Sequence, residues 1–174
     1  MKKQIFILLF SIVATFCHAQ KTNDLKSNEI LRAKNWLIEN VERELNSSNG
    51  LDFNSNDQAE GKSKSIYTKM YESYKSDALQ IDLEGGMTSA QFKKKWERNF
   101  QTKFAGEGVG FLISAQDYGM IVVSECNFIE NKTQKAFWFK TTIFDSENKL
   151  EYYRDIKVIP SGNSFLIADI LEYN

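Results

Sequence analysis

Histidine, cysteine and proline are nearly absent from this chain of 174 residues. The single histidine is His18, and the two cysteines are Cys17 and Cys126. Two of these three residues lie near the N-terminus, directly after an apolar run over residues 5–16. Whether that stretch belongs to the working protein therefore decides which chemistry is available.

The N-terminus has the pattern of a secretory signal peptide. A short basic start precedes twelve mostly apolar residues, fewer than the roughly 20 needed to cross a bilayer. Ala19 is a small residue suited to cleavage, so we expect removal of residues 1–19 and one exported domain, periplasmic or secreted, over residues 20–174. A lipid anchor at Cys17 is the alternative, and the bulky residue before that cysteine disfavours it.

Export would leave a mature chain with no histidine and with Cys126 as its one cysteine. Histidine is the usual general base near neutral pH and the commonest metal ligand, so its absence excludes Ser-His-Asp triads, Cys-His pairs and histidine-based zinc sites. A lone cysteine forms no intramolecular disulfide. We therefore predict no catalytic triad, no metal site and no cofactor, with Cys126 as a small apolar core residue.

The charge of the chain is close to balanced. Without Lys2 and Lys3, 20 basic and 23 acidic residues remain, which gives a net charge of −3. The longest basic cluster, residues 93–95, is too short for the dense basic face that nucleic-acid binding needs. We expect no nucleic-acid partner and no membrane span, and about 155 residues suffice for one domain with its own core.

Three segments in the first part of the chain have helical periodicity. Apolar residues recur at spacings of three and four over residues 28–46, about 64–79 and about 89–100. Thr88 and Gln91 have the spacing of a capping box at the start of the third segment. The aromatic stripes of the later two segments predict core contacts, and a ligand pocket lined by them is the alternative.

After Gly106 the periodicity changes to alternation, which is typical of strands. Short links with turn residues separate five predicted strands, which cover residues 109–115, 120–130, 135–145, 149–159 and 164–173. Links this short join antiparallel neighbours, so the strands form a meander. Helices followed by strands predict an α+β domain in which the N-terminal helices pack on one face of a curved antiparallel sheet.

Symmetric closure of each link also predicts the strand register. It gathers the apolar side chains on one face, together with one polar row that pairs in sequence: Ser124, Thr141, Arg154 and Asp169. Burying an ionised group costs several kcal/mol unless the group is paired. We therefore predict that Arg154 and Asp169 form a structural ion pair or, with Tyr152, line a small-molecule pocket.

The opposite face of the predicted sheet combines charges of alternating sign with an apolar patch. The patch consists of Trp138, Phe144, Tyr153, Ile121 and Ile170. A large exposed apolar patch indicates a partner surface. We predict that the chain forms a homodimer through this face.

Three helices followed by a long meander, ending in SFLIADILEY, resemble the nuclear-transport-factor-2-like, or cystatin-like, superfamily and its uncharacterised secreted members. The resemblance implies a curved sheet wrapped around a long helix, a cone-shaped cavity between them, and dimerisation through the outer face. Family members include ligand binders, protein-binding modules and enzymes. Its epoxide hydrolases use an Asp-Arg-Asp cluster, to which Arg154 and Asp169 are similar in part, whereas Asp155 is turned to the other face.

Three functions follow from these patterns. The first is an exported non-catalytic binding module whose cone holds a small apolar or amphipathic ligand, with Arg154 facing an anionic or carbonyl group. The second is an enzyme of hydrolase or isomerase type, in which Asp169 acts as general base and Tyr152 orients the substrate. The third is an envelope protein-interaction subunit that uses the face around Trp138. The missing histidine and the lack of a catalytic motif favour the first.

Overall fold

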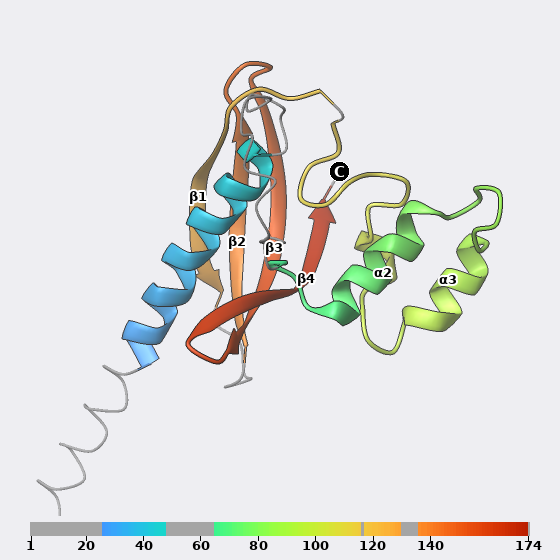
Figure 1. Ribbon diagram of the computed structural model, residues 1–174, viewed down its shortest axis with the longest axis horizontal. Helices are drawn as coiled ribbons and strands as arrows, with labels where there is room; N and C mark the ends of the chain where they lie inside the picture. The colour runs from blue at the N-terminus through green and yellow to red at the C-terminus, as the bar shows by residue number, and fades with distance from the viewer. Residues whose placement is uncertain (1–25, 48–64, 116, 130–135, 174) are drawn as a thin grey trace, which may run out of the picture.

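A long helix over residues 26–47 lies across one face of a four-stranded sheet in the computed structural model of this protein (Figure 1). The structure describes residues 26–47, 65–115, 117–129 and 136–173. The predicted signal peptide therefore lies outside the described residues. Within these ranges, no helix has both the length and the apolar character required to cross a membrane.

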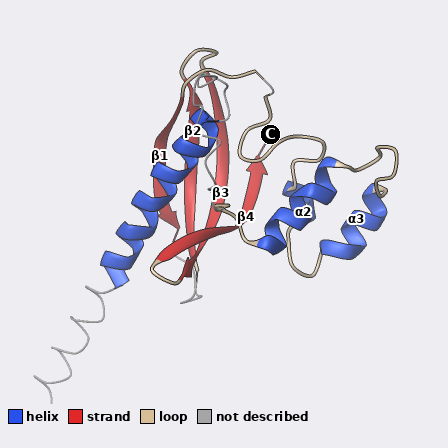
Figure 2. Cartoon of the chain, viewed as in Figure 1, coloured by secondary structure: helices blue, strands red, loops and turns tan. Residues whose placement is uncertain are grey.

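Two shorter helices lie beyond the last strand of the sheet (Figure 2). They are α2 (Lys69–Leu79) and α3 (Ser89–Trp96), and the 3-10 helix η1 (Thr102–Phe104) follows them. The strands are β1 (Ile121–Ile129), β2 (Phe137–Asp145), β3 (Leu150–Ser161) and β4 (Ser164–Tyr173). They are adjacent in the order β1-β2-β3-β4, and each pair is antiparallel. The predicted α+β class and antiparallel meander are confirmed.

The long helix packs on the sheet through one apolar stripe, as the sequence predicts. Ala33, Leu37 and Val41 recur every four residues and are fully buried, because positions four apart share one helix face. Polar side chains also fix the helix against β1. Asn46 exchanges hydrogen bonds of 2.9 and 3.0 Å with the backbone of Ile121, and the Glu42 carboxylate accepts one from the Val123 N–H.

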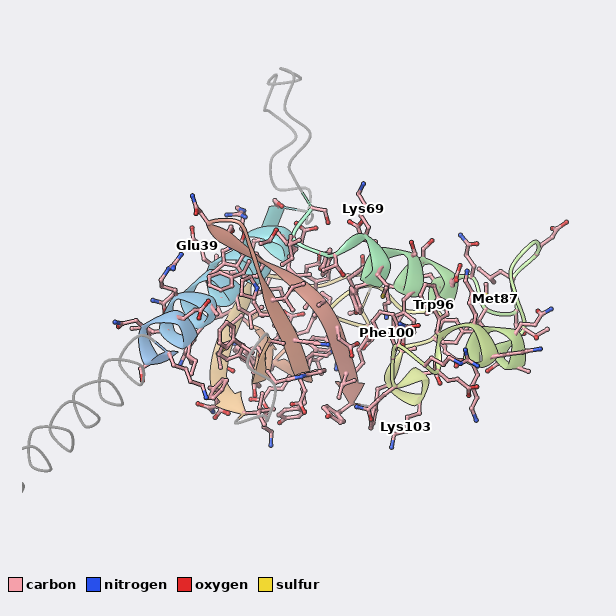
Figure 3. The ribbon with its side chains drawn as sticks, turned by 90° about the horizontal axis from the view of Figure 1, so that it is seen from below. Glu39, Lys69, Met87, Trp96, Phe100 and Lys103 are labelled. Carbon is pink, nitrogen blue, oxygen red and sulfur yellow. The ribbon has the colours of Figure 1, made fainter. Side chains whose placement is uncertain are left out.

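Aromatic side chains fill the space between α2 and α3. The rings of Tyr74 and Phe100 stack with centroids 4.1 Å apart, and Trp96 donates a hydrogen bond of 2.7 Å to the Asp77 carboxylate. Figure 3 labels Trp96 and Phe100 on this side of the molecule, with Glu39 of the long helix at the other end. The predicted core role of these aromatic stripes is confirmed, as is the capping box at the start of α3.

The register between β2 and β3 is the predicted one. Phe139 lies opposite Ile156, and Thr141 lies opposite Arg154. The turn between the two strands is held by Asp145, whose carboxylate accepts hydrogen bonds from the following backbone N–H groups of Glu147 and Asn148. A short aspartate turn of this kind closes the hairpin symmetrically.

The predicted register between β1 and β2 is wrong in two steps, since Thr141 pairs with Cys126, two residues beyond the predicted Ser124, and a bulge then interrupts β1. Val123 pairs with Ile143 and Glu125 pairs with Thr142, so Ser124 is an extra residue without a partner in the ladder. One extra residue exchanges the two faces of the strand beyond it. The prediction that Ser124 lies opposite Thr141 fails because Cys126 occupies that place in the ladder. Ile121 is buried in the core rather than exposed on the outer face.

The predicted register between β3 and β4 is also wrong, for two reasons. The connecting turn has two residues rather than four, because Ser161 pairs with Ser164 and Gly162 takes a positive φ of 60°. A bulge at Ala168 then shifts the register again. As a result Ile170, predicted on the outer face, is buried in the core.

The charged pair predicted between β3 and β4 changes with this register. Arg154 lies opposite Glu172, and Asp169 lies opposite Lys157. The predicted pairing of Arg154 with Asp169 is therefore wrong, and Arg154 faces a different carboxylate. Both bulges bend their strands, as bulges do in curved sheets.

The predicted strand over residues 109–115 is absent, and this part of the chain is irregular. Gly106 and Gly108 have positive φ angles of 59° and 71°, and Leu112 has a positive φ of 65°. Such angles break the extended conformation. Residues 105–115, called the wall segment from here on, run between η1 and the sheet.

Candidate functional site

Three charged side chains are buried together between α2, β3 and β4. They are Lys75 of α2, Arg154 of β3 and Glu172 of β4, and the most exposed of them is 4% accessible. Burying ionised groups is costly unless each one is paired and hydrogen-bonded. Their partners therefore explain how this part of the molecule is built.

Lys75 uses all of its hydrogen-bonding capacity. Its Nζ donates to the carbonyl oxygens of Ala105 at 2.7 Å and Gly106 at 3.0 Å, and to the Glu172 carboxylate. Three acceptors require the three N–H bonds of an ammonium, since a neutral amine has only two. Burial lowers the pKa of Lys75 and contact with Glu172 opposes this, and the three acceptors favour the charged form.

Arg154 donates hydrogen bonds to backbone carbonyls in three parts of the chain. Its Nε donates to the Leu112 carbonyl at 2.8 Å, and its Nη1 donates to the carbonyls of Tyr153 and Tyr173 at 2.8 and 3.2 Å. Its Nη2 lies 3.8 Å from Glu172 Oε2. One carboxylate thus lies between two cations, and backbone carbonyl oxygens accept the hydrogen bonds from Nε and Nη1 of Arg154.

The two buried cations set the path of the wall segment. Lys75 binds its start at Ala105 and Gly106, and Arg154 binds it again at Leu112. Glycine is required at position 106, because a Cβ there would lie 2.2 Å from the Glu172 carboxylate and φ is positive. The wall segment is irregular because tertiary hydrogen bonds determine its conformation.

A cleft of about 520 Å³ opens on the outer side of the wall segment. The end of the long helix, the residues before and at the start of α2, and the wall segment form its sides. The described residues that line the cleft include Glu44, Tyr67, Glu72, Gly110, Phe111 and Tyr118. Aromatic side chains therefore line the cleft together with the carboxylates of Glu44 and Glu72.

Tyr67 lies between the cleft and the buried charges. Its backbone is fixed beside β4, because Ile167 exchanges hydrogen bonds of 2.8 Å with Ile66 and Thr68 on either side of it. The side chain is 8% exposed, and its hydroxyl has no hydrogen-bond partner among the described residues. Burial raises the pKa of Tyr67, and the nearby carboxylates of Glu44 and Glu172 raise it further. A buried hydroxyl without a hydrogen-bond partner is costly, and the hydroxyl of Tyr67 is also closed off from solvent.

The residues predicted to bind a ligand are only partly brought together. Arg154 and Tyr152 are neighbours, with the guanidinium 5.7 Å from the ring centroid, and Thr141 is buried opposite Arg154. Ser124 is exposed at its bulge, and Asp169 lies three residues before Glu172 along β4. None of the five is among the described residues that line the cleft. Their contact with a ligand stays a prediction.

Asp169 is buried without a cation in contact with its carboxylate among the described ion pairs. Burial raises the pKa of Asp169 to about 6, while the charge of Lys157 and the backbone N–H of Ile170 act in the opposite direction. The pKa of Asp169 is raised by burial alone, because the Arg154 guanidinium is paired with Glu172 instead.

The outer face of the sheet keeps part of its predicted apolar patch. Tyr153 is 48% exposed, and Trp138 and Phe144 are half-buried. The Nζ atom of Lys157 lies 5.9 Å from the ring centroid of Trp138, and that of Lys149 lies 5.8 Å from the ring centroid of Phe144. With Ile121 and Ile170 in the core, the patch is smaller than predicted, and dimerisation through it stays a prediction.

Sequence reasoning missed the residues that build the site, although one signal was present. Tyr67, Tyr71 and Lys75 are spaced four apart, so a lysine lies in line with the aromatic residues of the predicted stripe. A cation on an apolar stripe indicates a buried partner. Glu172 gave no comparable signal, because the bulge at Ala168 decides which face it occupies.

No protein-family model, curated protein or solved structure matches this chain. The resemblance to the nuclear-transport-factor-2-like superfamily thus depends on the order of elements and on the pattern of the last strand. The function has to be inferred from the chain's own geometry.

Proposed function

We propose that this chain is an exported, non-catalytic binding protein that holds a small ligand in the cleft beside the wall segment. One observation carries the proposal, the cleft of about 520 Å³ with Tyr67 and Phe111, whose rings are in contact, in its lining. Ligand sites in proteins have volumes of roughly 300–1,000 Å³ and combine apolar walls with a few polar groups. The side chains around this cleft fit that description.

The composition of the lining favours binding over catalysis. Its described residues include aromatic rings, aliphatic side chains and two carboxylates, and they include neither histidine nor cysteine. The carboxyl with the strongly raised pKa, Asp169, is not among them. The buried cations also fix the wall segment before any ligand arrives, and a preorganised wall reduces the entropic cost of binding.

The same proposal includes the fold family of the protein and its export. The long helix along a bent sheet, with bulges in β1 and β4, supports a cone-shaped fold of the nuclear-transport-factor-2-like kind, with the cleft at its open end. The basic and apolar N-terminal pattern supports export. A structure of a complex with a ligand in the cone would test the family assignment directly.

A variant that fills the cleft tests the binding function. Gly110 tolerates a side chain, since its φ is ordinary and an added Cβ meets only Ile113 O at 3.5 Å. We expect fragments that bind the full chain to shift NMR signals of Tyr67 and Phe111. Gly110→Trp should abolish these shifts, and Ser114→Trp, at an exposed position of the same segment outside the lining, should keep them. Fragments that bind elsewhere, or equally to both variants, would contradict the proposal.

Self-association through the outer face is a second proposal, supported by the exposure of Tyr153 beside Trp138 and Phe144. An apolar group of this kind is typical of a partner surface. Light scattering should give the mass of a dimer for the full chain and of a monomer for Tyr153→Glu. Leu83→Glu, at an exposed site in the link between α2 and α3, is the control that should stay dimeric. A monomer at high concentration would overturn this proposal.

A further inference from the structure

Glu172 is the anion of the buried charge cluster that it forms with Lys75 and Arg154, and it uses one of its two carboxylate oxygens. Oε1 accepts a hydrogen bond from Lys75 Nζ, whereas Oε2 is buried and has no hydrogen-bond partner among the described residues. The side chain of Glu172 is only 1% exposed. A buried carboxylate oxygen without a donor carries a large desolvation cost. Oε2 therefore needs a donor that is small enough to fit in the interior.

Arg154 lies close to this oxygen without bonding to it. Its Nη2 is 3.8 Å from Glu172 Oε2, and N–H···O hydrogen bonds have donor–acceptor distances of about 2.7–3.2 Å. The Nε and Nη1 atoms donate to the backbone carbonyls of Leu112, Tyr153 and Tyr173. A polar contact longer than about 3.5 Å is of the kind that a water molecule bridges. Two hydrogen bonds of about 2.8 Å can meet at one oxygen atom when their other ends are 3.8 Å apart.

The hydroxyl of Tyr71 is a third polar group without a partner. The side chain is fully buried, and its Oη has no hydrogen-bond partner among the described residues. Burial raises the pKa of Tyr71 well above its ordinary value, and the carboxylate of Glu172 raises it further. Tyr71 is also among the groups that act on the Arg154 guanidinium. A phenol both donates and accepts, so Tyr71 can complete the surroundings of a molecule that Glu172 and Arg154 hold.

The wall segment separates this position from the cleft. Lys75 binds the start of the segment, and Arg154 binds it again at Leu112. Neither cation, nor Glu172 or Tyr71, is among the described residues that line the cleft. A molecule between Glu172 and Arg154 is therefore enclosed, and it exchanges with solvent when the protein opens locally.

The charges determine which kind of molecule fits. Lys75 and Arg154 together with Glu172 give the cluster an excess of one positive charge, which repels a metal ion. A chloride ion would offset that excess, but it has no proton for Glu172 Oε2 and the carboxylate would repel it. Water both donates and accepts, and buried waters make about three hydrogen bonds to polar groups that the protein leaves unpaired. Water therefore satisfies all of these groups at once.

We propose that a buried water molecule is part of the charge cluster, where it donates a hydrogen bond to Glu172 Oε2, accepts one from Arg154 Nη2 and bonds to the Tyr71 hydroxyl. The water joins α2, β3 and β4 at the point where side chains of these elements hold the wall segment. This inference goes beyond the binding function and does not depend on what the cleft holds.

A crystal structure of the full chain, grown in the presence of bromide, tests the site directly. We expect one density peak within about 3.2 Å of both Glu172 Oε2 and Arg154 Nη2, without an anomalous signal. An anomalous peak at this position would overturn the inference, because bromide would then occupy an anion site. A direct hydrogen bond between the two side chains, with nothing between them, would overturn it as well.

Substitution of Tyr71 tests the third partner in solution. Tyr71→Phe removes only the hydroxyl, and the loss of its hydrogen bond to the water should lower the folding equilibrium constant about fivefold in urea denaturation. Tyr153→Phe, which removes a hydroxyl from an exposed ring of β3, is the control and should change the constant by less than about threefold. An unchanged or larger constant in Tyr71→Phe would overturn the inference, because removing a hydroxyl that has no partner does not destabilise a protein.

Discussion

The long helix and α2 are attached to the sheet in different ways. The long helix buries an apolar stripe against it, with Leu37 and Val41 at the centre. At α2 the contact includes buried charges, because Lys75 meets Glu172 of β4 beside Arg154 of β3. Apolar packing is non-directional and tolerates changes of similar volume, whereas buried charges need their partners in place. The first attachment provides stability, and the second fixes the geometry of the wall segment and its cleft.

The largest expected effect comes from removing the shared carboxylate. Glu172→Gln leaves Lys75 and Arg154 buried without an anion, so we expect the free energy of unfolding to fall by about 4 kcal/mol. Urea denaturation followed by circular dichroism measures this. The control Glu125→Gln, at an exposed position of β1, should change it by less than about 0.5 kcal/mol. A loss below about 1 kcal/mol in Glu172→Gln would contradict the view that these charges depend on one another.

The same kind of substitution on the two helices compares the attachments directly. Lys75→Met removes three hydrogen bonds and leaves Glu172 buried, so we expect a loss of about 3 kcal/mol. Leu37→Met conserves volume in the long helix and should cost about 1 kcal/mol or less. Denaturant unfolding of both variants under one condition gives the difference. Equal losses would mean that α2 is held by packing alone.

The next effect depends on pH and concerns Asp169. The pKa of Asp169 is raised by burial to about 6, so its contribution to stability is complete below its ordinary pKa of about 4 and is lost as pH rises through 6. Asp169→Asn should therefore stabilise the protein by about 2 kcal/mol at pH 7 and have no such effect near pH 3.5. Unfolding curves at both pH values check this. The same difference at both would show that the ionisation of Asp169 is not the cause.

The smallest effect concerns the start of α2. Thr68 Oγ1 accepts a hydrogen bond from the Tyr71 N–H and caps the helix, so Thr68→Ala should cost about 1 kcal/mol. Ser73→Ala, at an exposed site of the same helix, is the matched control and should change stability by a few tenths of a kcal/mol. Hydrogen exchange of the Tyr71 amide should become faster in Thr68→Ala only. Unchanged exchange would count against the cap.

The attachment of the long helix could be predicted from sequence, and that of α2 could not. The stripe of Leu37 and Val41 follows from helical periodicity alone. The β2–β3 register also follows, because Asp145 closes a regular turn. The bulges at Ser124 and Ala168 escape such reasoning, because consecutive apolar residues stand beside each of them, Val122 and Val123 in β1 and Leu166 and Ile167 in β4, so the sequence is compatible with either phase of the alternation.

The cleft was beyond prediction for a related reason. Its wall is irregular because Lys75 and Arg154 hold the backbone carbonyls of residues far away in sequence. Local residue preferences predict a strand over residues 109–115, but tertiary hydrogen bonds give this segment an irregular conformation instead. The buried ion pair was predicted as a feature of β3 and β4, but with Asp169 in place of Glu172.

The chain itself covers part of the free edge of both outer strands of this sheet. At β1 the backbone N–H groups of Ile121 and Val123 are already bonded to Asn46 and Glu42 of the long helix, and at β4 both polar groups of Ile167 are bonded by the chain on either side of Tyr67. Edge strands with free backbone groups are where fibrils and strand exchange begin. At these points the fold resists polymerisation, because an incoming strand would first have to displace the protein's own side chains and backbone.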